Sequence, residues 1–127
     1  MYDPQVLIER LESVREILER IPRRFQGIAQ PEDFLATDEG VDRMDAICMI
    51  LIAAGEEFKN IDRKTDGTLF NRYPGVDWRG AIRVRDVMAH GYFQVNVHQL
   101  FSICREDIPR LIETLRTMIR DLKRGAP

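Results

Sequence analysis

The stretch MDAICMILIAA (residues 44–54) decides the fold, because Asp45 is its only charged residue. A segment that is apolar on every side predicts a helix at the centre of a bundle or in an interface. The flanking pattern extends this predicted helix from about Asp38 to Lys64. Gly55 follows the apolar stretch; it lowers helix propensity but allows a neighbouring helix to approach closely.

Further segments have the spacing of amphipathic helices. The first begins at Asp3-Pro4, where Asp is a good N-cap and Pro fits the first turn, and extends to about residue 22. The others are predicted at about 78–89, about 97–105 and about 107–123, with residues 27–40 and 66–74 as connectors. Without a convincing strand or repeat, the chain is predicted to be an all-α bundle of four or five helices. Residues 1–127 are expected to form a single domain.

The composition narrows the classes of function. A net charge of −2 argues against a broadly basic nucleic-acid binder, but it leaves room for a local basic cleft. The stretch from residue 72 to residue 86 contains four arginines against two aspartates. No apolar run approaches the ~20 residues of a membrane span, and the N-terminus lacks a signal-peptide pattern. The chain is therefore expected to be cytoplasmic, with Cys48 and Cys104 as buried free thiols rather than a disulfide.

The run RDVMAHGYF (residues 85–93) holds the groups most suited to chemistry. Arg85 can neutralise a phosphate and stabilise developing negative charge, while His90 can transfer protons near neutral pH. Tyr92 adds a hydroxyl that can bind, donate or be modified. Together these groups suggest attack on a phosphodiester, with RNA as the expected substrate. The competing interpretation is the end of a helix with a hydrogen-bonded core histidine and a packed tyrosine.

The spacing within this run limits how the groups can meet. Arg85 and His90 are roughly 140° apart around an ideal helix, whereas Arg85 and Tyr92 share a face if the helix continues. Gly91 makes a break after His90 plausible. Convergence of Arg85 and His90 therefore requires a bend or a contribution from a second subunit.

Other groups give weaker signals. Asp38, Asp42 and Asp45 form an acidic face that suits a metal or a basic partner, but acids near a helix start more often favour the helix dipole. His98 is expected to be a structural or surface residue, because no partner lies at zinc-site spacing. Trp78 is expected to anchor a helix start in the core, with base stacking as the alternative. The apolar cluster around Met49 is expected to serve packing or a dimer interface rather than ligand binding.

The C-terminal half resembles the HepT-like family of HEPN domains. The matching text is PGVDWR (residues 74–79), the Arg85–Phe93 run and EDIPRL (residues 106–111). AAGEE (residues 53–57) is similar to the family's apolar-Gly-Glu stretch on the long helix. The resemblance spans roughly residues 35 to 120, and its most specific part is the Arg-x4-His-x-Tyr spacing.

The resemblance implies a helical bundle that forms a homodimer with two copies of the motif facing one cleft. Many members are toxins of toxin–antitoxin pairs: metal-independent endoribonucleases without a cofactor, inactivated by a minimal nucleotidyltransferase antitoxin that adds AMP to the motif tyrosine. Carried over, Arg85 and His90 would be catalytic and Tyr92 would be modified. Asp86 would occupy the supporting polar position, where asparagine is common. Two alternatives stay open: a non-catalytic subunit that presents nucleotide or substrate to the transferase, and a helical interaction module.

Overall fold

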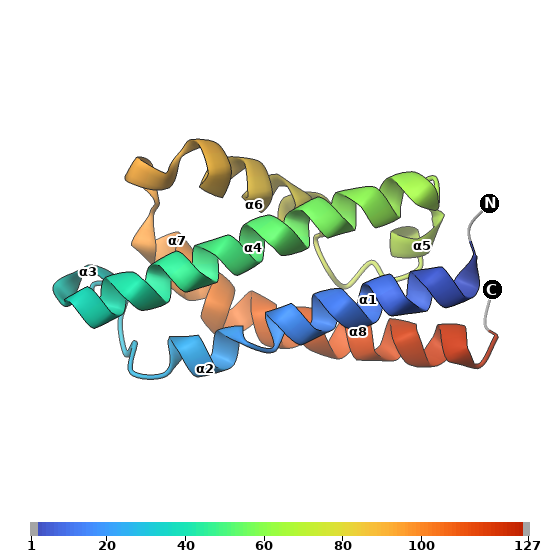
Figure 1. The fold of residues 1–127 in the computed structure, drawn as a ribbon, viewed down its shortest axis with the longest axis horizontal. Coiled ribbons are helices and arrows are strands. Elements are labelled where there is room, and N and C mark those ends of the chain that lie inside the picture. Colours follow the sequence, from blue (N-terminus) through green and yellow to red (C-terminus); the bar gives the residue numbers. More distant parts are fainter. Residues whose placement is uncertain (1–2, 126–127) are drawn as a thin grey trace.

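The computed structural model describes residues 3–125, apart from the side chain of Tyr92. Within that range the chain is helical and contains no strand, so the predicted all-α architecture is confirmed (Figure 1). The longer helices are α1 (Pro4–Leu18), α4 (Asp38–Lys64), α6 (Trp78–His90) and α8 (Ile108–Lys123). The shorter elements are α2 (Ile21–Phe25), α3 (Asp33–Ala36), α5 (Thr68–Asn71), the 3₁₀ turn η1 (Tyr92–Gln94), α7 (Val97–Ser102) and the π-helical turn η2 (Ile103–Asp107). None of the described helices is long and apolar enough to cross a membrane.

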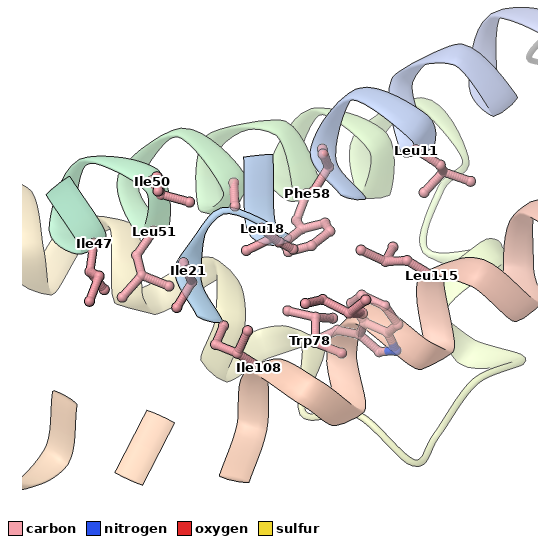
Figure 2. Packing of buried hydrophobic residues seen from close by; sticks show 14 of the residues in the cluster. Leu11, Leu18, Ile21, Ile47, Ile50, Leu51, Phe58, Trp78, Ile108 and Leu115 are labelled. Carbon is pink, nitrogen blue, oxygen red and sulfur yellow. The ribbon is translucent and has the colours of Figure 1, made fainter. Parts of the chain in front are cut away.

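The long helix α4 organises the bundle. It packs against α1 on one side and against α6 on the other, while α1 also packs along α8 (Figure 1). Apolar residues from α1, α4 and α8 form a continuous core, which includes Leu11, Ile47 and Leu115, each without exposed surface (Figure 2). The central position predicted for residues 44–54 is therefore confirmed for the face of α4 that lies in the core. Another face of the same helix is not covered, and Met49 on it is 65% exposed.

Polar side chains begin the helices at the predicted places. The carboxylate of Asp3 accepts a hydrogen bond from the backbone N–H of Gln5, and the hydroxyl of Thr37 accepts from Gly40. Asp77 caps α6 through the N–H of Gly80, at 2.9 Å. These caps satisfy N–H groups that have no partner within the helix, and so fix where each helix starts.

Two predicted helix boundaries are wrong for reasons that involve proline. The first helix ends at Leu18 rather than near residue 22, because the ring of Pro22 cannot follow the carbonyl of Leu18 within one helix; Pro22 instead lies in the first turn of α2. The regular α-helix predicted at about 97–105 ends at Ser102. The chain stays helical beyond it, through the π-helical turn η2 into α8. Pro109, in the first turn of α8, has no N–H to donate to the preceding turn, and the regular α-helical hydrogen bonds are interrupted there. The predicted connector at 66–74 contains α5.

Trp78 anchors the start of α6 in the core, as predicted. The residue is 8% exposed, and its ring stacks on that of Phe70 with a centroid separation of 4.1 Å. The ring of Phe58 contacts it edge-on, with the centroids 5.5 Å apart (Figure 2). The indole Nε1 donates a hydrogen bond to the carbonyl of Tyr73, 2.8 Å away. The phenol of Tyr73 in turn donates to Asp121 of α8 at 2.7 Å. The buried ring is therefore committed to packing and does not present a face for base stacking.

The two cysteines are buried and free, as expected from the sequence. Burial raises the pKa of the Cys48 thiol to about 11 and that of the Cys104 thiol to about 12. The Cys48 Sγ lies 3.7 Å from the Met88 sulfur, so α4 and α6 also meet through sulfur contacts. Both thiols are therefore protonated packing groups rather than nucleophiles at neutral pH.

The backbones of α4 and α6 approach one another closely at Gly55. A Cβ atom on residue 55 would lie 2.6 Å from the Cβ of Arg85 and 3.2 Å from the carbonyl oxygen of Ala81. Neither atom can move without displacing the α6 backbone. The predicted role of Gly55 in close helix approach is therefore confirmed, and the contact fixes the position of α6 on α4.

Replacing Gly55 with alanine should force α4 and α6 apart. We expect Gly55→Ala to lower the free energy of unfolding by about 1–3 kcal/mol, because overpacking outweighs the gain in helix propensity. Urea denaturation followed by circular dichroism measures the change. Gly75→Ala is the control, since a Cβ there meets no atom within 4 Å and should change stability by less than about 0.5 kcal/mol. Equal stability of Gly55→Ala and wild type would contradict the close contact.

Candidate active site

The C-terminal half of α6 carries Arg85, Asp86 and His90 on one uninterrupted helix. The helix runs from Trp78 to His90 without a break, and it ends at Gly91, whose N–H donates to the carbonyl of Val87 at 2.9 Å. The predicted break after His90 is confirmed. Because both residues lie in this one helix, the ideal helical geometry separates Arg85 from His90 by roughly 140° around the axis.

Arg85 faces α4 and contacts two carboxylates. Its Nε lies 3.0 Å from the Oε2 of Glu56, and its Nη1 donates to the Oδ1 of Asp86 at 2.7 Å. The hydrogen bond to Asp86 and the charge of Glu56 raise the pKa of Arg85, so the guanidinium stays charged. The same hydrogen bond lowers the pKa of Asp86 below its usual range. No described residue forms a hydrogen bond with the Nη2 of Arg85.

Glu56 is the site residue to which sequence reasoning gave no role. It lies on α4, next to Gly55, far from the motif in sequence. The absence of a side chain at Gly55 brings the α6 backbone close, and the next residue then meets Arg85. The signal in the sequence was an acidic residue directly after a glycine that allows close helix approach. This signal indicates a pairing with Arg85 only when it is known that α6 is the helix that packs on α4 at this glycine.

His90 is exposed in the last turn of α6. The interpretation of His90 as a hydrogen-bonded core histidine is therefore wrong. Asp86 lies one turn before it, and the positive charge of His90 contributes to the lowered pKa of the Asp86 carboxylate. Within one chain, roughly 140° of helical rotation places His90 and Arg85 on different faces of α6.

Tyr92 begins the turn η1 directly after Gly91, and its side chain lies outside the described part of the structure. The expectation that Arg85 and Tyr92 share one helical face required the helix to continue past His90. The helix ends there instead, because Gly91 closes its last turn. The relation between the Tyr92 phenol and Arg85 therefore stays a prediction.

The remaining candidates are not part of this site. His98 is exposed, and its Nε2 lies 3.2 Å from a carboxylate oxygen of Glu32, which agrees with the surface role expected for it. The acidic side chains near the start of α4, Asp38 and Asp42 among them, belong to no group of three or more potential metal ligands among residues 3–125.

Comparison with known proteins identifies the family of this chain. The family model described as "Ribonuclease HepT-like" matches residues 8–118, which include the whole site. The chain belongs to the HepT-like family. The resemblance noted in the sequence, and with it the all-α HEPN-like fold, is thereby confirmed.

Two curated relatives cover most of this chain. A Thermococcus cleftensis protein named "Probable ribonuclease HepT" is 35% identical over 102 residues, which cover 80% of this chain and 84% of the relative. A Methanocaldococcus jannaschii protein named "Putative RNase MJ0127" is 26% identical over 117 residues, covering 92% and 87% of the two chains. No solved structure gives a significant match.

The contact between Arg85 and Asp86 can be tested by titration. We expect Arg85→Gln to raise the pKa of the Asp86 carboxyl towards its ordinary value, because the variant removes the charged donor that stabilises the carboxylate. NMR titration of the side-chain carboxyl carbon measures this pKa. Arg63→Gln, at the far end of α4, serves as the control and should leave the Asp86 pKa low. An unchanged Asp86 pKa in Arg85→Gln would show that the contact is not formed in solution.

Proposed function

We propose that this protein is a metal-independent endoribonuclease in which Arg85 and His90 are the catalytic residues. The observation that carries the proposal is the placement of Arg85: two carboxylates, from Glu56 and Asp86, hold its guanidinium, and the same helix ends in the exposed His90. A fixed cation at a phosphodiester stabilises the additional negative charge of the transition state. The family and the names of the two relatives support RNA as the substrate.

The proposed reaction uses the ribose 2′-hydroxyl as the nucleophile. The 2′-oxygen forms a bond to phosphorus while the bond from phosphorus to the 5′-oxygen breaks. An imidazole of His90 accepts the proton of the 2′-hydroxyl or donates a proton to the leaving 5′-oxygen. The products are a 2′,3′-cyclic phosphate and a 5′-hydroxyl. DNA lacks the nucleophile and would not be cut.

A homodimer would bring the two catalytic groups together. Arg85 and His90 lie on different faces of α6, so the imidazole that acts with one Arg85 would come from the other copy. A stripe on α4 supports this arrangement: Met49, Ile52 and Ala53, at helical spacing, lead to Glu56 beside Arg85. Met49 and Ala53 are exposed and Ile52 is half-buried, as suits an isologous contact between two copies.

Control by a nucleotidyltransferase antitoxin would make the enzyme the toxin of a two-component pair. In the proposed modification, the Tyr92 hydroxyl attacks the α-phosphate of ATP, forms a bond to AMP and releases pyrophosphate. Tyr92 follows His90 by two residues and begins η1, which places the modification close to the catalytic histidine along the chain. The added phosphate would compete with RNA for Arg85, and the adenosine would occupy space in the cleft.

Cleavage of RNA by the purified chain, without a partner and in the presence of a chelator, tests the ribonuclease proposal. We expect Arg85→Ala and His90→Ala each to reduce cleavage by about 100-fold or more, because each removes a group that acts in the transition state. His98→Ala is the matched control and should cleave like wild type. If wild type bound RNA but left it intact, the non-catalytic binding subunit would be the better account.

The modification of Tyr92 is tested by co-expressing the chain with a family nucleotidyltransferase. Mass spectrometry should detect a mass gain of one or more AMP units on Tyr92 of the wild type. Tyr92→Phe has no hydroxyl to modify; it should stay unmodified and remain active when the transferase is present. A fully inhibited complex with unmodified Tyr92 would contradict the modification and indicate inhibition by occlusion of the site.

A further inference from the structure

A groove separates α6 from the run formed by α7, η2 and α8. Among the described residues, α6 packs extensively on α4, and α8 packs on α1 and η2, without a comparable contact between α6 and α8 (Figure 1). The space between them is a cavity of about 580 Å³. Val84 and Val87 of α6 and Ile103 of η2 contribute its apolar lining.

Two arginines line this groove without protein partners. Arg83 of α6 and Arg110 of α8 are exposed, and neither forms a hydrogen bond or ion pair with the described residues. Two carboxylates also line the groove, those of Asp77 and Asp107. Asp77 is engaged in capping α6, whereas Asp107 is exposed and lies within the helical run that continues from η2 into α8. The two guanidinium groups are cations that are free to bind an anionic ligand.

The groove continues the face of α6 that carries His90. Arg83 precedes His90 by seven residues, which is about two turns, so the two side chains lie roughly 20° apart around the helix and about 10.5 Å apart along it. Val87 lies between them, one turn before His90. A strand bound at His90 therefore meets first an apolar side chain and then a cation as it follows α6.

We propose that this groove binds one nucleotide of the RNA substrate next to the cleaved bond. The base would lie against Val84, Val87 and Ile103, and the adjoining phosphates would bind Arg83 and Arg110. The cavity has the size of small-ligand sites, which run from about 300 to 1,000 Å³ and combine apolar walls with a few polar groups. Arginine suits this position because it binds phosphate and its plane can stack on a base. The inference rests on the proposed action on RNA.

Binding of a single-stranded RNA with all 2′-hydroxyls methylated tests the proposal without cleavage, because the nucleophile is blocked. We expect Arg83→Gln and Arg110→Gln each to raise the Kd by about ten-fold in fluorescence anisotropy, the loss of one charge-assisted hydrogen bond. Arg63→Gln, an exposed arginine at the end of α4, is the matched control and should change the Kd by less than about two-fold. Unchanged Kd values for both groove variants would overturn the proposal.

NMR of methyl groups locates the bound RNA independently of any variant. The methyl signals of Val84, Val87 and Ile103 should shift as this RNA is added to wild type. The exposed methyls of Val6 and Leu35 serve as controls and should not shift. If the methyl signals of the groove did not shift with RNA but shifted when a purified nucleotidyltransferase was added, the groove would be a protein-docking surface and the proposal would be wrong.

These measurements separate the groove from the catalytic proposal. Suppose that the methylated RNA shifts the methyl signals of the groove, but the same RNA without methylation is not cleaved. This result would support the nucleotide site and reject the ribonuclease activity. RNA that is cleaved through Arg85 and His90, while Arg83→Gln and Arg110→Gln bind and cleave like wild type, would reject the nucleotide site alone.

Discussion

The crossing of α4 and α6 at Gly55 is the contact on which the site depends. A residue with any side chain at this position would collide with the Cβ of Arg85 and push α6 away from α4. With glycine, the two backbones approach closely enough for Glu56 to reach the Arg85 guanidinium at 3.0 Å. One packing constraint therefore sets both the position of α6 in the bundle and the contact of the Arg85 guanidinium with Glu56.

The same crossing separates the two halves of the motif. Since Arg85 and His90 lie in one continuous helix, the contact of Arg85 with α4 leaves His90 exposed to solvent. A single chain thus presents an oriented cation on one face and an exposed imidazole on another. In the proposed homodimer, a symmetric pair of chains would resolve this separation. Ribonuclease activity would then depend on assembly and would be open to control by a ligand or protein that occupies the cleft between the two chains.

Local signals predicted most of the fold. The bounds Asp38–Lys64 of the long helix were predicted as found, since its apolar pattern and its polar ends both lie in the sequence around it. The end of α1 was predicted too late, because a proline can either follow the end of one helix or lie in the first turn of the next. Here Pro22 lies in the first turn of α2, and α1 ends four residues earlier, at Leu18. The partnership of Glu56 with Arg85 was out of reach, because it joins two helices whose crossing point only the folded chain reveals.

Mixing two inactive variants tests most directly whether the site is shared between chains. Arg85→Ala and His90→Ala subunits would be mixed in equal amounts, allowed to exchange, and assayed for RNA cleavage. Each mixed dimer contains one intact pair of Arg85 and His90, so random exchange should restore about a quarter of wild-type activity. If native mass spectrometry showed mixed dimers but no cleavage was recovered, the site would not be shared between the two chains.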